Sequence, residues 1–131
     1  MTASTVSAVR NVVLLGHTGS GKTSLVEAML AHAGAIPAAG SIEKGTTVCD
    51  FDPLERQFGH SLQSSLVNFA WDGHQVYLAD TPGMPDFSGQ SLAALSCADT
   101  ALLVIDAQAG IQPTTERLMR QASARNICRM I

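Results

Sequence analysis

Eight consecutive residues near the N-terminus have the types and spacing needed to hold a chain of phosphates. They are Gly16, His17, Thr18, Gly19, Ser20, Gly21, Lys22 and Thr23. The segment matches G-x-x-x-x-G-K-[ST] in full, a pattern whose glycines let backbone N–H groups and a helix N-terminus face a di- or triphosphate. Lys22 would place a positive charge on the terminal phosphates, and the Thr23 hydroxyl could bind Mg²⁺. The alternative is a glycine-rich turn that happens to contain a lysine.

A second segment, Asp80-Thr81-Pro82-Gly83, could complete the same site. It follows the apolar residues 76–79, so Asp80 is expected at the carboxyl end of a strand. An acid there can hold Mg²⁺ through water, and Gly83 can approach the γ-phosphate. Asp, Pro and Gly are also common in ordinary turns. The complete phosphate loop upstream favours the functional interpretation.

The residues around the phosphate loop indicate the elements that would position it. Residues 11–15 are apolar after Asn11 and stop at Gly16, which is typical of a parallel strand buried on both faces. From Lys22 onward apolar residues recur at four-residue spacing, and Gly34 is a natural C-terminal cap, so a helix of about three turns is expected. The loop is therefore predicted to lie between a strand and a helix.

The middle of the chain predicts a loop and then a hairpin. Residues 34–61 show no sustained period, and we interpret them as a nucleotide-sensing loop. Residues 62–69 and 75–79 read as strands, and Asp72-Gly73 between them is a strong hairpin signal that leads to Asp80.

The last third of the chain alternates between helix and strand. A helix over residues 88–97, a buried strand over residues 100–105 and a helix that begins near Pro113 are expected. This order predicts an α/β protein of the P-loop NTPase fold. Its sheet would be mostly parallel, with helices on both faces and one antiparallel hairpin, and ligands would bind at the carboxyl ends of the strands.

Composition restricts the class of protein. The chain has 131 residues, of which 46% are hydrophobic and 15% charged, as expected for one compact domain. A net charge of −3 argues against direct nucleic-acid binding by this segment through phosphate neutralisation. The three cysteines are far apart and odd in number, so we interpret them as reduced thiols. No apolar run approaches ~18 residues, and we expect a cytoplasmic protein without a membrane partner.

Several segments together resemble the translational GTPases, and within them elongation factor G and its bacterial elongation factor G-like relatives. Besides the phosphate loop, these are Gly45-Thr46-Thr47-Val48, Asp50-Phe51-Asp52-Pro53, Gly59-His60-Ser61-Leu62, Asp80-Thr81-Pro82-Gly83 with Asp86-Phe87, and Val104-Ile105-Asp106-Ala107 with Gly110. The resemblance implies GTP or GDP with Mg²⁺ as cofactors and the ribosome as partner. It also implies that residues 59–62 are switch I and residues 80–89 switch II.

Ser61 stands where this family usually has the threonine that binds magnesium from switch I. Serine keeps the hydroxyl and loses a methyl group. The resemblance therefore implies a metal site of Thr23, Ser61 and Asp80. The alternative is an exposed serine that enters a strand and has no ligand role.

Met84 occupies the place where elongation factor G has the histidine that orients the attacking water, and it belongs to the segment expected near the nucleotide. Methionine has no hydrogen to offer there. If that contribution is lost, hydrolysis should slow by roughly 10²–10⁴-fold, so sound binding with poor turnover is predicted. The catalytic residue stays unassigned. His60 or His17 could compensate, although a lone loop histidine is more often a solvated surface residue.

The family reads guanine with N-K-x-D at the end of a following strand, and this chain contains no such motif. Residues 126–131 resemble the start of that strand. We therefore expect an N-terminal leader over residues 1–10 and a truncated P-loop GTP-binding domain over residues 11–131, with a fold that is incomplete at its C-terminal side. An apolar sheet edge would then be exposed.

Two functional hypotheses follow. The first is GTP binding and hydrolysis by an elongation factor G-like translation factor that acts on the ribosome in elongation or translocation. The alternative is a GTP-binding paralogue with little or no hydrolysis, which acts as a regulatory ribosome-binding module. A P-loop kinase or ATPase would need a lid with catalytic arginines, and its mechanism would not require Asp86-Phe87.

Overall fold

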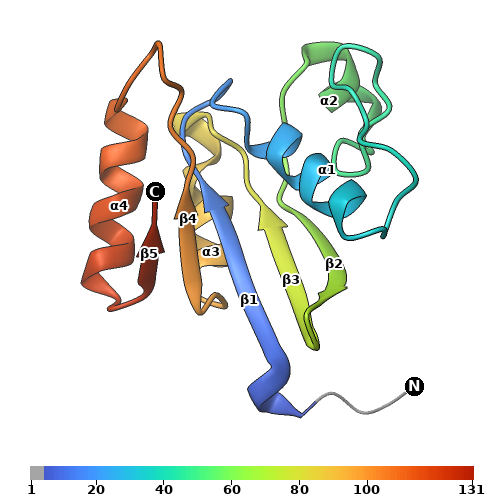
Figure 1. Cartoon of the computed structure of the whole chain (residues 1–131). Coiled ribbons are helices and arrows are strands. Elements are labelled where there is room, and N and C mark those ends of the chain that lie inside the picture. The colour runs from blue at the N-terminus through green and yellow to red at the C-terminus, as the bar shows by residue number, and fades with distance from the viewer. Residues whose placement is uncertain (1–4) are drawn as a thin grey trace.

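One sheet organises the molecule (Figure 1). The computed structural model describes residues 5–131, apart from the side chain of Arg56. The described residues form a five-stranded sheet in the order β2-β3-β1-β4-β5. The strands are β1 (Val9–Leu15), β2 (Ser65–Trp71), β3 (His74–Asp80), β4 (Thr100–Leu103) and β5 (Cys128–Met130). Among these strands only β2 and β3 pair antiparallel, which confirms the predicted mostly parallel sheet with one hairpin.

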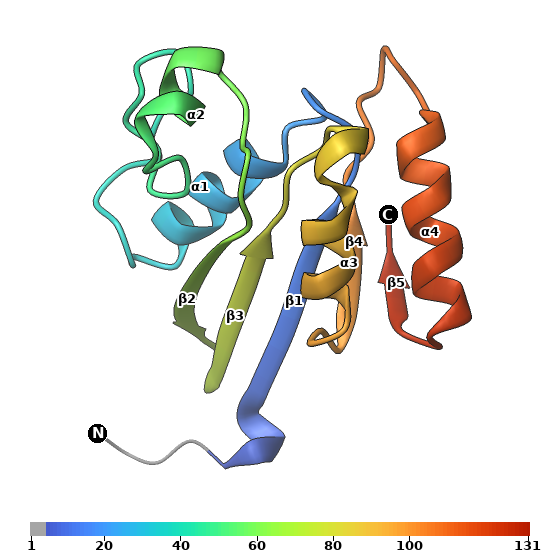
Figure 2. The same ribbon diagram turned by 180° about the vertical axis from the view of Figure 1, so that it is seen from behind.

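Helices cover both faces of this sheet. They are α1 (Lys22–His32), α2 (Pro53–Phe58), α3 (Ser88–Leu95) and α4 (Pro113–Ala124), with short 3₁₀ turns η1 (Val6–Ala8) and η2 (Pro85–Phe87). Figure 1 shows α1 in front of the β3 side of the sheet, and Figure 2 shows α3 on the opposite face with α4 beside it. The predicted two-sided arrangement is therefore confirmed.

Successive residues of β1 enter two separate cores. Leu14 packs on the α1 face with Val26 and Leu30, whereas Val13 and Leu15 pack on the opposite face with the α3 and α4 side chains. All three β1 side chains have no exposed surface. Burial of such a side chain stabilises the fold by roughly 1.5–3 kcal/mol, so the central strand holds the phosphate loop on a rigid base.

The hairpin between β2 and β3 forms as its sequence indicates. Trp71 pairs with His74, and the two loop residues Asp72 and Gly73 have φ angles of 45° and 74°. Both lie in the left-handed region that a type I′ turn needs. This turn is favoured in hairpins because its twist matches the right-handed twist of the strands. The hairpin therefore places Asp80 at the end of β3.

Residues 34–61 contain a helix that the prediction of a loop missed. The Asp52 side chain accepts a hydrogen bond from Leu54 N at 2.8 Å, and Glu55 accepts one from Asp52 N at 3.3 Å, so a capping box begins α2, with Pro53 at its first position. The D-x-x-E signal was present in the sequence. Apolar periodicity did not reveal it, because the helix has six residues and leaves Leu54 and Phe58 exposed.

Several element boundaries differ from the prediction. β1 starts at Val9, before the expected residue 11, and β4 ends at Leu103 rather than at residue 105. β2 starts at Ser65 and not at residue 62, because the Glu55 carboxylate takes the N–H groups of Leu62 and Gln63. The helix expected to reach residue 97 ends at Leu95.

Two further features concern the cysteines and the helices. The three cysteines carry free thiols, with Cys49 buried and the other two exposed. Within residues 5–131, no helix combines the length and the apolar character needed to cross a bilayer.

Candidate phosphate and metal site

The phosphate loop lies between β1 and α1, as the sequence predicts. Gly21 is the N-cap of α1 with a φ of 93°, in the left-handed region that favours glycine. Glycine has no side chain, so no side-chain hydrogen bond caps this end of the helix. The first N–H groups, which have no partner within the helix, therefore remain suited to an anion.

Lys22 folds back over this loop. Its side chain is buried, and Nζ donates to the carbonyl oxygens of Gly16 at 3.1 Å and His17 at 2.8 Å. Burial lowers the pKa of Lys22, while the charge of Asp80 acts in the opposite direction. A buried cation held mainly by carbonyl oxygens is a suitable partner for incoming phosphate oxygens.

Thr23 and Asp80 join the loop to the end of β3. The Thr23 hydroxyl donates to Asp80 Oδ2 at 2.6 Å, and Asp80 is only 1% exposed. The other carboxylate oxygen, Oδ1, is buried and has no hydrogen-bond partner. Burial raises the pKa of Asp80 to about 6, although the Thr23 hydrogen bond and the Lys22 charge oppose the rise.

These atoms pass a chemical test for a magnesium site. An unpartnered buried carboxylate oxygen is costly, and a cation would remove that cost. The neighbouring atoms that could bind a metal are hydroxyl and carboxylate oxygens, which are the ligands that Mg²⁺ prefers. Mg²⁺ usually binds only one or two carboxylates together with phosphate oxygens. The residues present therefore fit Mg²⁺ beside a bound nucleotide.

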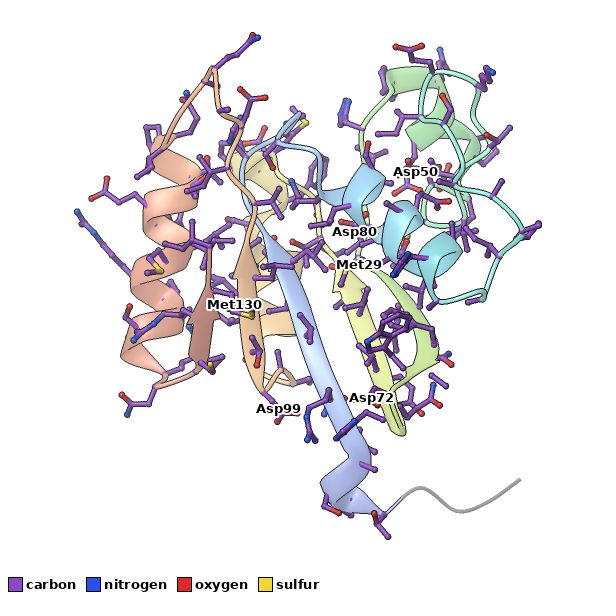
Figure 3. All side chains as sticks on the ribbon, in the orientation of Figure 1. Met29, Asp50, Asp72, Asp80, Asp99 and Met130 are labelled. Carbon is purple, nitrogen blue, oxygen red and sulfur yellow. The ribbon has the colours of Figure 1, made fainter. Side chains whose placement is uncertain are left out.

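Ser61 reaches the same place from the far end of the long connection that follows α1, which comprises residues 34–61. Its Oγ lies 3.4 Å from Thr23 Oγ1 and donates to Asp50 Oδ1 at 2.8 Å. Asp50 also accepts from the Thr47 hydroxyl at 3.0 Å. Figure 3 shows Asp50 and Asp80 at the same end of the sheet, with Asp72 at the opposite end. Asp50 belongs to one of the segments that resemble translational GTPases, but no local pattern around it indicated this contact with Ser61.

A small cavity of about 130 Å³ is lined by Lys22, Thr23, Asp50 and Ser61, while Asp80 is not part of its lining. Its walls come from the phosphate loop, the long connection and the segment after β3. They consist of Thr18, Gly19, Gly21, Lys22, Thr23, Ser24, Ile42, Asp50, Gly59, His60, Ser61, Thr81 and Gly83. Most of the predicted site residues are thus brought together.

The remaining predicted residues lie around this cavity rather than in its walls. Met84 and His17 line a neighbouring cavity of about 540 Å³, to which His60 and Thr18 also contribute. Gly16 and Pro82 are buried, and Pro82 O accepts a hydrogen bond from Ser91 Oγ at 3.1 Å. Ser20 Oγ is buried without a partner. A third cavity of about 460 Å³, between the sheet and α3, contains no charged side chain and is unsuited to a polyphosphate.

Gly83 determines how closely the two predicted motifs approach each other. A Cβ atom at this position would meet the backbone of His17 and Thr18. The glycine predicted to approach the γ-phosphate therefore contacts the phosphate loop itself in this structure.

Two buried carboxylates, which sequence reasoning missed, anchor the long connection, Glu27 from α1 and Glu55 from α2. Glu27 accepts hydrogen bonds from Gly40 N at 2.9 Å and Val48 N at 2.6 Å. Glu55 accepts from Leu62 N at 2.9 Å and Gln63 N at 3.0 Å. Both side chains are 1% exposed. Glu27 resembles a surface charge on a helix and no local signal marks it, whereas Glu55 belongs to the D-x-x-E signal at the start of α2.

Comparison with known proteins adds a family to this geometry. Residues 7–131 match the family described as elongation factor Tu GTP binding domain. The chain is 45% identical over 122 residues to an elongation factor G-like protein of Mycobacterium tuberculosis. The aligned region covers 93% of this chain and 17% of that protein. It is 38% identical over 130 residues to elongation factor G 2 of Streptomyces coelicolor, covering 99% of this chain and 19% of that one.

A solved structure agrees with these relatives. The crystal structure of ttk003000868 from Thermus thermophilus superposes with a TM-score of 0.90 at 40% identity, covering 95% of this chain and 19% of that one. The chain thus spans less than a fifth of the length of each of these three proteins.

Proposed function

Because the chain belongs to the elongation factor Tu GTP binding domain family, as a translational GTPase of the elongation factor G type, we propose that it binds GTP and GDP with Mg²⁺ and hydrolyses GTP. We further propose that the whole protein does this on the ribosome, in elongation or translocation. The support for the second step is the similarity to proteins named elongation factor G.

One observation carries the proposal for this site. The Thr23 hydroxyl, the unpartnered Oδ1 of Asp80 and the buried ammonium of Lys22 converge beside one small cavity at the N-terminus of α1. Such a group of cation, hydroxyl and carboxylate suits a phosphate chain with a divalent metal. Thr23, Ser61 and Asp80 would hold Mg²⁺, which supplies neutralisation of charge on the β and γ phosphates.

The residues of the chain would then act as follows. Lys22 Nζ exchanges the carbonyl oxygens of Gly16 and His17 for phosphate oxygens. Ser61 couples the presence of the γ-phosphate to the conformation of the long connection, since its hydroxyl already lies beside Thr23 and Asp50. Loss of the γ-phosphate would remove that anchor and release residues 59–62.

A second candidate function is a GTP-binding module with little hydrolysis. Met84 favours it, because a thioether is a weak acceptor and no donor and this side chain lies outside the phosphate cavity. The two candidates share the binding site and differ only in turnover.

Nucleotide binding tests the shared part. Fluorescent GTP and GDP analogues are titrated into the protein with Mg²⁺, and into Lys22→Met and Lys44→Met. Lys44 is the matched control, because it is the exposed lysine of the long connection. We expect Lys22→Met to lose affinity and Lys44→Met to retain it. Folded protein without affinity for either nucleotide would contradict the proposal.

Single-turnover hydrolysis, with and without ribosomes, separates the two candidates. A rate that ribosomes stimulate supports the translation GTPase. Unchanged bound GTP under both conditions supports the binding module.

A further inference from the structure

His60 lies where the phosphate cavity meets its neighbour. Among the residues that the structure describes, it is the one histidine in the lining of the 130 Å³ cavity that contains Lys22 and Thr23. It also lines the 540 Å³ cavity that contains Met84 and His17. A side chain shared by both cavities can reach a water molecule that approaches the phosphates from the Met84 side.

We infer that His60 accepts a hydrogen bond from the attacking water and orients it during GTP hydrolysis, while Met84 only shapes the wall. This inference rests on the proposed function of the site. It assigns a catalytic residue to a chain in which the side chain of Met84 offers no nitrogen or oxygen atom.

The contacts of the imidazole leave the required nitrogen available. His60 Nδ1 lies 3.0 Å from the carbonyl oxygen of Phe58. A carbonyl oxygen can only accept, so Nδ1 carries the hydrogen, and in the neutral ring Nε2 is then an acceptor. Nδ1 donation to a backbone carbonyl commonly sets the function of the other nitrogen in this way.

The local backbone also holds the ring in place. Gly59 ends α2 in the left-handed conformation, with a φ of 68°, and turns the chain back toward the phosphate loop. The Phe58 ring lies beside the imidazole, with centroids 5.9 Å apart. Ser61, the proposed metal ligand, follows directly, so a γ-phosphate that recruits Ser61 would position His60 in the same movement.

His17 is the other histidine near the reaction centre, and its contacts fit the role less well. Its Nδ1 is buried without a hydrogen-bond partner, and the side chain lines only the outer cavity. The carbonyl of His17 already receives the Lys22 ammonium. His32 lies beside Trp71, with ring centroids 5.2 Å apart, His74 lies at the start of β3, and neither side chain lines either cavity.

The reaction balances with water as the second substrate. The water oxygen forms a bond to the γ-phosphorus as the bond from that phosphorus to the β–γ bridging oxygen breaks, and the bridging oxygen leaves on GDP with the electron pair. Nε2 accepts a hydrogen bond from the water, and this contact directs a lone pair of the water oxygen toward phosphorus. Both water hydrogens finish among inorganic phosphate, GDP and solvent, and the imidazole ends as it began.

The test compares His60→Gln and His60→Phe in single-turnover GTP hydrolysis by the protein with Mg²⁺ and ribosomes. Glutamine keeps polar atoms that can hold water, whereas phenylalanine keeps the ring beside Phe58 and has no nitrogen. We expect His60→Phe to hydrolyse GTP about 100-fold more slowly than the wild type, and His60→Gln to retain about tenfold more activity than His60→Phe. The affinity of both variants for GTP should stay close to the wild-type value.

His74→Ala is the matched control. His74 Nδ1 makes the same contact to the carbonyl of the residue two positions earlier, Asp72, at 2.8 Å, but at the far end of the hairpin. We expect its hydrolysis rate to equal that of the wild type. Thermal melts of each variant verify that it is folded.

Three outcomes overturn the inference. The first is a rate for His60→Phe equal to the wild type, and the second is more activity in His60→Phe than in His60→Gln, which would indicate a packing role. The third is a wild-type protein that binds GTP and does not hydrolyse it, which leaves the proposed binding function intact. Absence of nucleotide binding by the wild type is instead a failure of the proposed function itself.

Discussion

Thr23 and Asp80 lie 57 residues apart in the chain and are joined by a hydrogen bond of 2.6 Å. The bond links the start of α1 to the end of β3, so two distant motifs form one site. It also leaves Asp80 Oδ1 buried and unpartnered. The site is therefore arranged for a cation at the expense of stability in the cation's absence.

Asp80→Asn should make the metal-free protein more stable at neutral pH. The pKa of Asp80 is raised from 3.8 to about 6 by burial, so folding disfavours its charge by an amount on the order of 3 kcal/mol. Well below pH 3.8 the carboxyl group is neutral in both the folded and the unfolded protein. The wild type loses stability relative to the variant as pH rises from about 4 to about 6, and the difference is complete above that range.

Urea denaturation at pH 4 and pH 7.5 measures this difference. The variant should unfold at higher urea than the wild type at pH 7.5 and at similar urea at pH 4. It should also lose the effect of Mg²⁺ on nucleotide affinity. Equal stability of the two proteins at pH 7.5 would show that Asp80 carries no buried-charge cost.

Ser61→Ala should weaken GTP binding more than GDP binding. The hydroxyl lies beside Thr23 and Asp50, where only the γ-phosphate state is expected to recruit it. We expect about a tenfold loss for GTP, equivalent to about 1.4 kcal/mol, and little change for GDP. Ser61→Thr should restore the affinity, because it keeps the hydroxyl.

Titration with GTP and GDP at fixed Mg²⁺ checks the effect of Ser61. Ser64→Ala is the control, because Ser64 Oγ has no hydrogen-bond partner and Ser64 does not line the phosphate cavity. An equal loss of GTP and GDP affinity in Ser61→Ala would contradict a γ-phosphate-specific role.

Glu55→Gln should loosen the segment that contains Ser61. The carboxylate accepts from the N–H groups of Leu62, Gln63 and Asp52, and an amide cannot accept at both of its ends. A lost acceptor in a buried site costs about 1–3 kcal/mol. Amide hydrogen exchange over residues 59–65 should therefore accelerate.

Glu43→Gln controls for the change of charge, since Glu43 is exposed on the same connection. Exchange over residues 59–65 should not change in this control. If Glu55→Gln also leaves this exchange unaltered, the buried carboxylate does not hold the segment.

Gly83→Ala should displace the phosphate loop. The added methyl group would meet the backbone of His17 and Thr18, which cannot move aside as a side chain can. Overpacking of this kind costs about 1–3 kcal/mol, and nucleotide affinity should fall with it. Thermal melts and nucleotide titration measure both effects.

Gly89→Ala is the matched control, because a Cβ atom at this helical position meets no atom within 4 Å. It should melt at the same temperature or slightly higher, since alanine favours a helix. Identical melting and binding of Gly83→Ala and Gly89→Ala would mean that the close approach at Gly83 has no energetic consequence.

The phosphate loop and the framework of strands and helices were predictable because their signals are local. Residues 11–15 form a strand whose last three side chains are buried, Asp72-Gly73 has one favoured turn, and Pro113 suits a first helical turn. The short helix α2 was missed although its capping box was visible, because a six-residue helix with an exposed face has no apolar period.

The sequence by itself determined which chemistry this protein can attempt, since a glycine loop with Lys22 and Thr23 suits phosphates wherever a strand precedes it and a helix follows. Only the tertiary structure decided which side chains share the site. Glu27 and Glu55 become buried anchors, Asp50 meets Ser61, and His60 rather than Met84 lines the phosphate cavity. Contacts between residues far apart in the chain depend on how the elements pack, and no local pattern encodes that packing.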